Sequence, residues 1–324
     1  MIVGLDDDDS TGNLGFCTSS YVTESDLIHF FQTNNNVSLN LLHINCRSLN
    51  KNFGSVTNLL HRIGSKLSVL GLCETWLNKN TENSFHMQGY NFACNSRSSR
   101  MGGGVGLYVD NSIQYSLRND LSIMSDELEC IFVELVQKNS ANIIVGCVYR
   151  PPNTDPYVFN MKLLPLLNLL NRNNKSPTFI MGDFNLDLLQ TATHVATSEF
   201  LNTLISHSYF PTIRHPTRVT DSSATLLDDI FTNNCKYEMF SAIMYCDISD
   251  HYPVALHVDL IPEKYNSNTG TSQKMRVFTS DAIEEFVHDL STHDWNEVIH
   301  NFVNRVDLNI SYDWFALKFK RNIL

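Results

Sequence analysis

The stretch Phe179-Ile180-Met181-Gly182-Asp183-Phe184-Asn185 places a carboxylate and an amide directly after a short apolar run. The run from Thr178 to Met181 predicts a buried strand, because it is short, apolar and bounded by turn residues. Asp183 and Asn185 then fall at the end of the strand, which is where sheets covered by helices present reactive side chains. Taken alone, the stretch is also typical of an ordinary Asp/Asn turn.

Polar side chains follow apolar, strand-like runs at several other places along the chain. These are Asn45 after 38–44, Glu74 after 67–73, Tyr149 and Arg150 at the end of 142–149, Asp228 within 226–232, and Asp250 with His251 before 253–260. An ionised carboxylate at the end of a buried strand costs free energy unless a cation, a proton or a hydrogen-bond donor compensates it. Their joint occurrence therefore predicts that several of these groups converge on one cation.

Segments with strand and helix patterns alternate over residues 37–260. Helical patterns cover 55–66 and 198–207, and another follows Pro151-Pro152, where Pro165 should kink the helix or mark its start. The short strands expected at 90–94, 103–109, 130–136 and 142–149 suggest an antiparallel meander. We therefore predict a four-layer α/β sandwich, with two packed mixed β-sheets flanked by helices.

Two segments lie outside this predicted domain. Residues 1–36 contain six acidic residues and no Lys or Arg, and they are expected to form a disordered, solvated leader. Residues 261–324 begin with a polar linker and regain helical patterns at 281–290 and 295–306. Because more than half of the net charge of −11 falls in the leader, the central region is close to neutral and does not predict strong non-specific coating of DNA.

The composition, 43% hydrophobic and 18% charged, is that of a folded globule. No apolar run approaches the ~18 residues of a membrane span, and the N-terminus does not look like a secretory signal. The eight cysteines form no Cys-x-x-Cys pair and no cluster with zinc spacing. We expect a protein without a membrane partner that stays inside the cell, in the nucleus or cytoplasm, with reduced cysteines.

Oxygen ligands select a hard cation, so Mg²⁺ is the expected metal, with Mn²⁺ as a substitute. Hydrolysis of a phosphodiester suits this set: the ion neutralises charge, a carboxylate orients or activates water, and an imidazole stabilises the transition state. Asp228 could hold His251 in its working tautomer and keep it cationic.

The complete set resembles the exonuclease-endonuclease-phosphatase superfamily, which includes AP endonucleases, DNase I-like nucleases, sphingomyelinases and inositol polyphosphate 5-phosphatases. The family marks occur in family order across residues 39–260, as Asn45, Glu74, Tyr149, Asp183 with Asn185, Asp228, and Asp250 with His251. The resemblance implies a DNase I-like fold and a metal-dependent phosphodiesterase.

The resemblance also implies a role for each matching residue. Glu74 and Asp250 would hold metal, and Asn45 would position metal or phosphate. Asp183 with Asn185 would orient or deprotonate the attacking water, Tyr149 would contact the scissile phosphate, and His251 paired with Asp228 would stabilise the developing charge. Whether Asp183 or His251 is the general base stays open at this point, as does the choice between one and two metal ions.

The sequence between these marks resembles the endonuclease domain of jockey-type non-LTR retrotransposons, which nicks target DNA. The resembling stretches are 43–49, 73–77, 102–109, 149–152, 215–218 with 224–228, and 249–254. Repair-type AP endonucleases usually carry an Asp two residues after the first Asn, where this chain has Arg47. The tail around 277–296 resembles the connector that precedes a reverse transcriptase domain in full-length elements.

Three arginines are candidate contacts to DNA phosphates: Arg97, Arg150 and Arg218. The run Gly102-Gly103-Gly104 lacks the spacing of a dinucleotide fingerprint and favours a tight turn into a strand. A DNA endonuclease, acting as a monomer, is the main hypothesis. The alternatives are a phosphoesterase of the same fold that acts on lipid or inositol phosphates, and a catalytically decayed remnant.

Overall fold

The computed structural model describes residues 19–33, 37–64, 66–98, 102–138, 140–172, 176–234 and 236–260, with 287–288 and 291–292. The chain divides into two compact units. Met1–Leu204 with Tyr209–Glu263 forms the first, and Ile205–Ser208 with Lys264–Leu324 forms the second. Both large sheets belong to the first unit, which contains every candidate site residue. Among the described residues, no helix combines the length and apolar character needed to cross a membrane.

The first sheet has seven strands in the order β1-β15-β16-β2-β3-β5-β4. Their bounds are Ser19–Val22 for β1, Met239–Met244 for β15, Val254–Asp259 for β16, Ser38–Asn45 for β2, Val69–Cys73 for β3, Val105–Asp110 for β5 and Tyr90–Asn95 for β4. The pairs β1/β15 and β2/β3 are parallel and the others are antiparallel, so the sheet is mixed.

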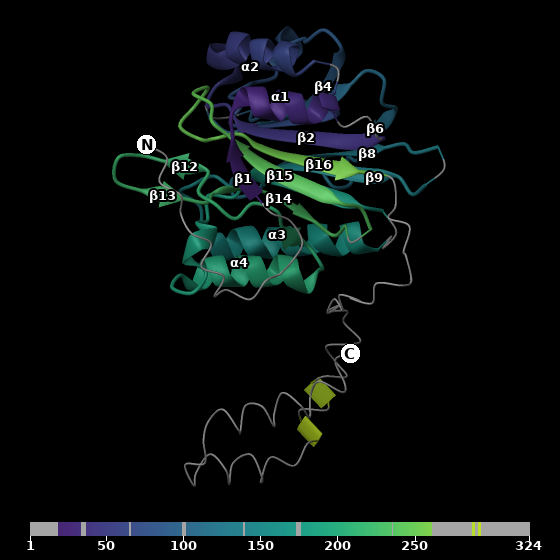
Figure 1. The fold of residues 1–324 in the computed structure, drawn as a ribbon. Helices are drawn as coiled ribbons and strands as arrows, with labels where there is room; N and C mark the ends of the chain where they lie inside the picture. Colours follow the sequence, from purple (N-terminus) through teal and green to yellow (C-terminus); the bar gives the residue numbers. More distant parts are fainter. Residues whose placement is uncertain are drawn as a thin grey trace. The chain divides into compact units, whose positions relative to one another are not determined.

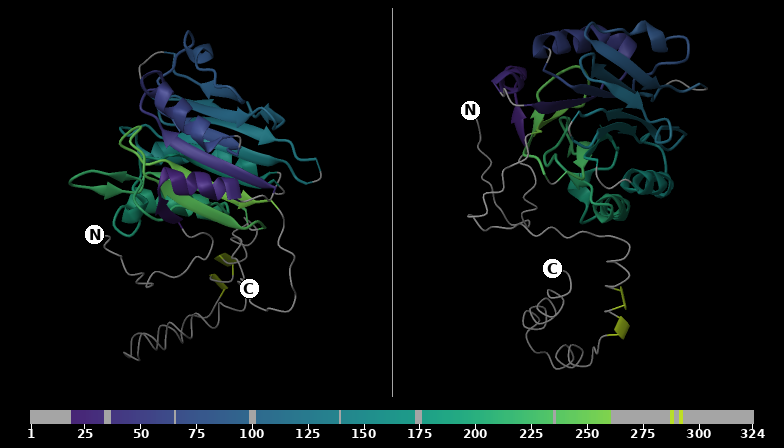
Figure 2. Two further views of the ribbon diagram at one scale, coloured as in Figure 1. Left: turned by 45° about the horizontal axis from the view of Figure 1, so that its top comes forward. Right: turned by 90° about the vertical axis from the view of Figure 1, so that its right-hand side faces the viewer.

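The second sheet has the strand order β11-β14-β10-β9-β8-β6, with β7 paired to β8. Their bounds are Phe210–Pro211 for β11, Asp228–Thr232 for β14, Thr178–Asp183 for β10, Ile143–Tyr149 for β9, Glu129–Leu135 for β8, Tyr115–Leu117 for β6 and Ile123–Met124 for β7. Only β9/β10 is parallel. A separate hairpin joins β12 (Arg218–Val219) to β13 (Ala224–Thr225), and Figure 2 shows it projecting beside the sheets.

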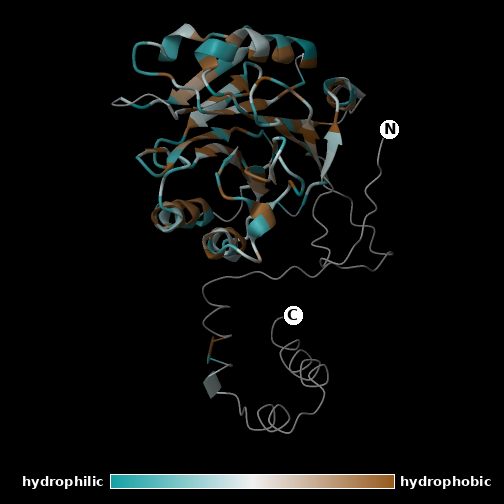
Figure 3. Ribbon diagram, turned by 90° about the vertical axis from the view of Figure 1, so that its left-hand side faces the viewer, coloured by the Kyte–Doolittle hydropathy of each residue, from teal (hydrophilic) through white to brown (hydrophobic). Residues whose placement is uncertain are grey.

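Three hydrophobic cores separate four layers of structure. The central core joins the two sheets, and the two outer cores join each sheet to a pair of helices. Helices α1 (Glu24–Thr33) and α2 (Leu49–Ile63) cover the first sheet, and α3 (Pro156–Asn171) and α4 (Val195–Ser206) cover the second (Figure 1). Hydrophobic residues gather on the strands between the helical layers (Figure 3). The predicted four-layer sandwich is confirmed.

The prediction of a disordered leader is wrong for residues 19–33, which form β1 and α1. β1 pairs in parallel with β15, and Leu27 and Phe31 are buried in the outer core. The sequence signal is a capping box: the Thr23 hydroxyl accepts the N–H of Asp26, whose carboxylate accepts the N–H of Thr23. Residues 1–18 lie outside the described residues, as does nearly all of 261–324.

The expected antiparallel meander is also wrong, because its strands are divided between two sheets. β4 and β5 pair with each other at the edge of the first sheet, whereas β8 and β9 pair in the second. Four short apolar segments with turns between them look alike in either arrangement, since the local pattern does not specify the partner strand.

Two helices differ from the expected bounds. Helix α2 begins at Leu49, six residues before the expected start, because the Ser48 side chain accepts the N–H of Lys51 and caps it. Helix α3 begins at Pro156 after its N-cap Asp155, so Pro165 lies inside the helix and does not mark its start.

Gly182 lies where β10 passes close to β9. A Cβ built on Gly182 would overlap the backbone carbonyl of Val148, which has no flexible end that can move aside. We expect Gly182→Ala to destabilise the protein by roughly 3 kcal/mol, as overpacking in a close-packed interior does. The free energy of unfolding from a denaturant titration measures the effect.

Gly54 provides a matched control for this substitution. It lies inside α2 with open space around the position of a Cβ, so Gly54→Ala should stabilise the protein by up to about 1 kcal/mol. Equal stability of the Gly182→Ala variant and the wild type would contradict the close approach of β9 and β10.

Candidate active site

The predicted site residues meet at one edge of the sandwich. The strands of β2/β3 run parallel to each other, and so do those of β9/β10, so in each pair the C-terminal ends of both strands lie at the same edge of the sheet. Asn45 ends β2, Tyr149 ends β9 and Asp183 ends β10, while Asp228 begins the antiparallel strand β14 directly opposite Asp183. The fold therefore brings together residues that are far apart in the chain.

Asn45 joins the two sheets by binding a carboxylate from each. Its side-chain Nδ2 donates to Glu74 Oε1 at 2.9 Å and to Asp183 Oδ2 at 2.8 Å. Its Oδ1 accepts the backbone N–H of Arg47 at 3.2 Å, which fixes the orientation of the amide. Two carboxylates thus converge on one neutral donor, which carries no positive charge to balance theirs.

Glu74 follows β3 in a loop with unusual backbone geometry. Its φ is +54°, and the φ of Trp76 is +55°. The loop is fixed by the N–H groups of Thr75 and Trp76, which donate to the carbonyls of Gly104 and Gly103. Gly102 to Gly104 all have positive φ, and β5 begins at Val105, which confirms the predicted tight turn into a strand.

Asp183 is fully buried and is held by the loop that follows it. The Asn185 backbone N–H donates to Asp183 Oδ1 at 3.0 Å, and the Asn185 side chain donates to Oδ2 at 3.2 Å. Burial, together with the negative charge of Asp228, raises the pKa of Asp183 to about 7, although these donors and His251 oppose the shift. A carboxylate with such a pKa is suited to accept a proton near neutral pH.

Asp228 and His251 form a buried pair. His251 Nδ1 lies 2.8 Å from Asp228 Oδ2, which also accepts the Thr217 hydroxyl at 2.8 Å. Burial disfavours a charged imidazole, but Asp228, Asp183 and Asp250 outweigh it and raise the pKa of His251 to about 9. Burial likewise opposes the charge of Asp228, yet His251, His43 and Thr217 hold the pKa of this carboxyl below its ordinary value. The pair is therefore an imidazolium and a carboxylate at neutral pH.

Asp183 belongs to the same cluster, because ligand atoms of Asp183, Asp228 and His251 all lie within 4.8 Å of one another. The Nδ1 of His251 is already occupied by Asp228, so we assign this trio to proton and charge chemistry rather than to metal binding.

His43, two residues before Asn45 on β2, was not among the predicted site residues. His43 is fully buried, and its Nδ1 lies 3.6 Å from Asp228 Oδ1, on the other oxygen from His251. Burial lowers the pKa of His43 to about 4 despite the pull of Asp228, so its imidazole is neutral. The alternation of β2 puts His43 and Asn45 on the same face, which was the available signal.

Tyr149 is 3% exposed and lies close to the two carboxylates. Burial, followed by the charges of Glu74 and Asp183, raises the pKa of its hydroxyl above the ordinary range. The phenol is therefore a neutral donor. In the described part of the chain its hydroxyl has no hydrogen-bond partner, which leaves the donor available to a phosphate oxygen.

Two of the three candidate phosphate contacts are instead part of the scaffold. Arg97 pairs with the fully buried Glu129 beneath the glycine turn, and its side chain is only 11% exposed. Arg150 is 3% exposed and donates to the carbonyls of Asn185 and Thr154. The expectation that these two residues bind DNA phosphates is corrected, because buried guanidinium groups with protein partners do not face a substrate.

Asp250, which the resemblance predicted to hold metal, forms ion pairs with Arg47 and Arg218. Arg47 donates to its Oδ1 at 2.9 Å, and Arg218 donates to its Oδ2 at 2.9 and 2.7 Å. Burial opposes ionisation, but these two arginines lower the pKa of Asp250 to about 2. Both oxygens of the carboxylate therefore accept hydrogen bonds from guanidinium groups.

Glu74 and Asn45 remain as oxygen-bearing groups that fit a hard divalent cation. Glu74 accepts hydrogen bonds from the neutral side chains of Asn45 and Trp76, so a divalent ion at this carboxylate would supply the positive charge that these donors lack. The donor set is made of oxygen atoms, which suits Mg²⁺ or Mn²⁺ and not a thiol-seeking metal.

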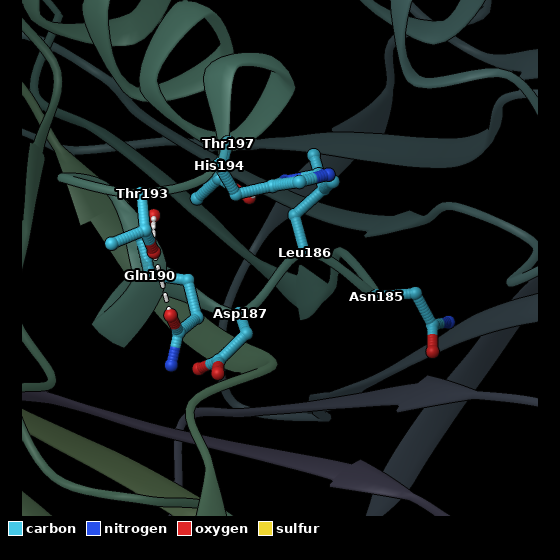
Figure 4. Close-up of a pocket in the computed structure, with 7 residues that line it drawn as sticks. All are labelled: Asn185, Leu186, Asp187, Gln190, Thr193, His194 and Thr197. Carbon is cyan, nitrogen blue, oxygen red and sulfur yellow. Dashed lines mark hydrogen bonds between the residues drawn. The ribbon is translucent and has the colours of Figure 1, made fainter.

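A cavity of about 430 Å³ begins at Asn185 and continues away from the carboxylates. It is lined by Asn185, Leu186, Asp187, Gln190, Thr193, His194 and Thr197. Figure 4 shows Asn185 on one side of it, with Gln190 and Thr193 on the other, where the Thr193 hydroxyl donates to Gln190 Oε1 at 2.7 Å. The cavity lies beside the proposed chemistry, and nothing in the sequence pointed to it.

The arrangement matches a known protein family. The model of the Endonuclease/Exonuclease/phosphatase family matches residues 38–251. A search of curated protein sequences finds no relative of this chain.

Solved structures share the fold at low sequence identity. An AP endonuclease from Leishmania major matches with a TM-score of 0.54 and 13% identity over 68% of this chain and 88% of that one. The endonuclease domain of TRAS1, a telomere-specific non-LTR retrotransposon, matches with a TM-score of 0.51 and 12% identity over 69% and 99%. A mannosyl-6-phosphatase from Bacteroides thetaiotaomicron matches with a TM-score of 0.51 and 13% identity over 68% and 99%. These similarities establish the fold, which serves both nucleases and phosphatases.

Proposed function

Since the chain belongs to the endonuclease/exonuclease/phosphatase family, whose members are hydrolases, we propose that it is a Mg²⁺-dependent phosphodiester hydrolase that nicks DNA. One observation carries the proposal. The Asn45 amide joins Glu74 and Asp183 across the two sheets, next to the ion pair of His251 and Asp228. A carboxylate that can hold a metal ion and one that can accept a proton, beside an imidazolium, suit the hydrolysis of a phosphodiester.

In this proposal Glu74 and the amide oxygen of Asn45 would hold a divalent ion, which would supply charge neutralisation at the scissile phosphate. Asp183, oriented by Asn185, accepts a proton from the attacking water as the new bond to phosphorus forms. The P–O bond to the leaving oxygen breaks and that oxygen takes up a proton from solvent water, while His251 and Tyr149 donate hydrogen bonds to the phosphoryl oxygens as negative charge builds up. Because Asp228 keeps His251 cationic, we assign the general base to Asp183.

The choice of DNA and of a mobile element rests on two kinds of support. The stretches that resemble jockey-type retrotransposon endonucleases include the Glu74 loop and the segment around Asp250 and His251. The fold is also shared with the endonuclease domain of TRAS1. In full-length relatives, the proposal places a reverse transcriptase domain after this chain. A monomer suffices, because one chain provides every group of the site.

A plasmid-nicking assay tests this function. We expect the protein to convert supercoiled plasmid to the open circular form in Mg²⁺ or Mn²⁺, and EDTA to abolish the reaction. Glu74→Gln should raise the Mg²⁺ concentration needed for half-maximal activity by about tenfold or more, because it removes a negatively charged ligand. The exposed Glu199→Gln on α4 serves as the matched control and should leave this concentration unchanged.

Other outcomes favour the other hypotheses. Hydrolysis of inositol or lipid phosphates with no cleavage of DNA would replace the nuclease by a phosphoesterase of the same fold. A folded protein that binds no Mg²⁺ in a calorimetric titration would contradict catalysis altogether and indicate a decayed remnant.

A further inference from the structure

The carboxylate of Asp250 is held between two arginines that come from different parts of the fold. Arg47 follows β2 in the first sheet, and Arg218 begins β12 in the projecting hairpin. Together they occupy both carboxylate oxygens, Arg47 through one nitrogen and Arg218 through two. The hairpin is thus tied to the edge of the first sheet through a single acidic residue.

The two guanidinium groups have hydrogen-bond donors left over. The side chains of Arg47 and Arg218 are 51% and 39% exposed, and in the described residues neither guanidinium has an acceptor other than Asp250. Within this trio of side chains, two cations against one carboxylate leave an excess of positive charge. An exposed, net positive surface with free planar donors is suited to a phosphate group.

This pair lies next to the carboxylates of the active site. The backbone N–H of Arg47 donates to Asn45 Oδ1, and Asn45 in turn binds Glu74 and Asp183. Asp250 is the main cause of the raised pKa of Arg47, and Glu74 and Tyr149 contribute to it, so the guanidinium is within electrostatic reach of both.

The position of Arg47 is fixed by its backbone. Its φ is +36° and that of Ser48 is +86°, which are backbone angles that residues other than glycine rarely adopt. The turn is held by the Ser48 N–H, which donates to the Glu74 carbonyl at 2.8 Å, and by the Ser249 hydroxyl, which donates to the Asn45 carbonyl at 2.6 Å. A strained turn with several independent supports is typical of a functional position.

We propose that Arg47 and Arg218 form a binding site for a phosphate group of the substrate backbone, and that Asp250 is a positioning residue for this pair and not a metal ligand. The proposal rests on the proposed function in one respect, since the phosphate is assigned to DNA. In this proposal two guanidinium groups, and not a metal ion held by Asp250, supply positive charge at this edge of the site.

Binding measured without metal separates this proposal from catalysis. Fluorescence anisotropy of a short labelled duplex oligonucleotide in EDTA, with the full chain, should give a Kd about tenfold higher for Arg47→Gln and for Arg218→Gln than for the wild type. The slope of log Kd against log salt concentration should fall by about one for each substitution. Arg47→Lys should weaken binding less, because it keeps the charge and loses the fork. The exposed Arg172→Gln at the end of α3 is the matched control and should bind as the wild type does.

Asp250→Asn tests the second half of the proposal. The Mg²⁺ concentration that gives half of the maximal thermal shift should stay within about twofold of the wild type, while the Kd for DNA in EDTA rises. A tenfold higher Mg²⁺ requirement in this variant would restore Asp250 as a metal ligand. Unchanged DNA binding by both arginine variants, or no binding by the wild type in EDTA, would overturn the phosphate site whatever the nicking assay gives.

Discussion

Asp183→Asn is expected to lower the rate of plasmid nicking by about 10²- to 10⁴-fold, the range that a general base contributes. The substitution keeps the size and shape of the side chain but removes its ability to accept the proton of the attacking water. The buried site with its raised pKa, and the two donors from Asn185, show that this carboxylate is held in a fixed position. Single-turnover nicking measures the chemical step without interference from product release.

Two controls make the result specific to the carboxylate. The unfolding transition of the Asp183→Asn variant should remain cooperative, which shows that the sandwich is intact. The exposed Asp120→Asn makes the same chemical change at a residue paired with Arg118, away from the site, and should leave the rate unchanged. A variant of Asp183 that retained more than about a tenth of the wild-type rate would remove Asp183 from the role of base.

Substitutions of the buried ion pair are expected to have the next largest effect. His251→Ala should lower the nicking rate by about 10²- to 10³-fold below the pKa of about 9, where the imidazole is protonated, because it deletes a cationic donor to the phosphoryl oxygens. The exposed His61→Ala on α2 removes an imidazole elsewhere and should have no effect.

Asp228→Asn should instead change the pH dependence. In the wild type the pKa of His251 is about 9, so activity that needs the imidazolium is present below this pH and is lost as the pH rises through it. Without the Asp228 charge the pKa should fall toward its ordinary value of about 6.5, so the loss should occur at a lower pH. At pH 8 the fraction of His251 that is protonated, and with it the nicking rate, should be about 30-fold lower in this variant than in the wild type. If the Asp228→Asn variant lost its activity at the same high pH as the wild type, this would contradict the assignment of His251 as the protonated group that activity needs.

Much of the site could be predicted because its residues lie at strand ends. Asn45, Asp183 and Asp228 meet because β2, β10 and β14 bring their ends to one edge, and the order of the motifs along the chain anticipated this. The partners of Asp250 could not be predicted, since Arg47 and Arg218 lie far from it in the sequence. The burial of Arg150 was equally hidden, because a guanidinium that binds carbonyls and one that binds phosphates look the same in a sequence.

The fold shows the same division between local and non-local information. The strands and helices followed from apolar patterns, and most lie within a few residues of their expected bounds. The assignment of β4 and β5 to one sheet and β8 and β9 to the other depends on pairing across the chain, which no local pattern encodes. The segment that forms β1 and α1 was obscured by the acidic composition of its surroundings, although Leu27 and Phe31 had the spacing of a helix face.

β1 has a practical consequence for anyone who trims this chain to a minimal domain. The family match begins at residue 38, which suggests residue 37 as the start of a recombinant fragment. Such a fragment would lack β1, which pairs with β15. It would also lack α1, whose Phe30 ring packs on the Phe240 ring with 4.5 Å between the ring centroids. The uncovered edge would offer free backbone groups and apolar rings to other molecules, which favours aggregation during expression. Fragments for crystallisation should therefore begin before Ser19.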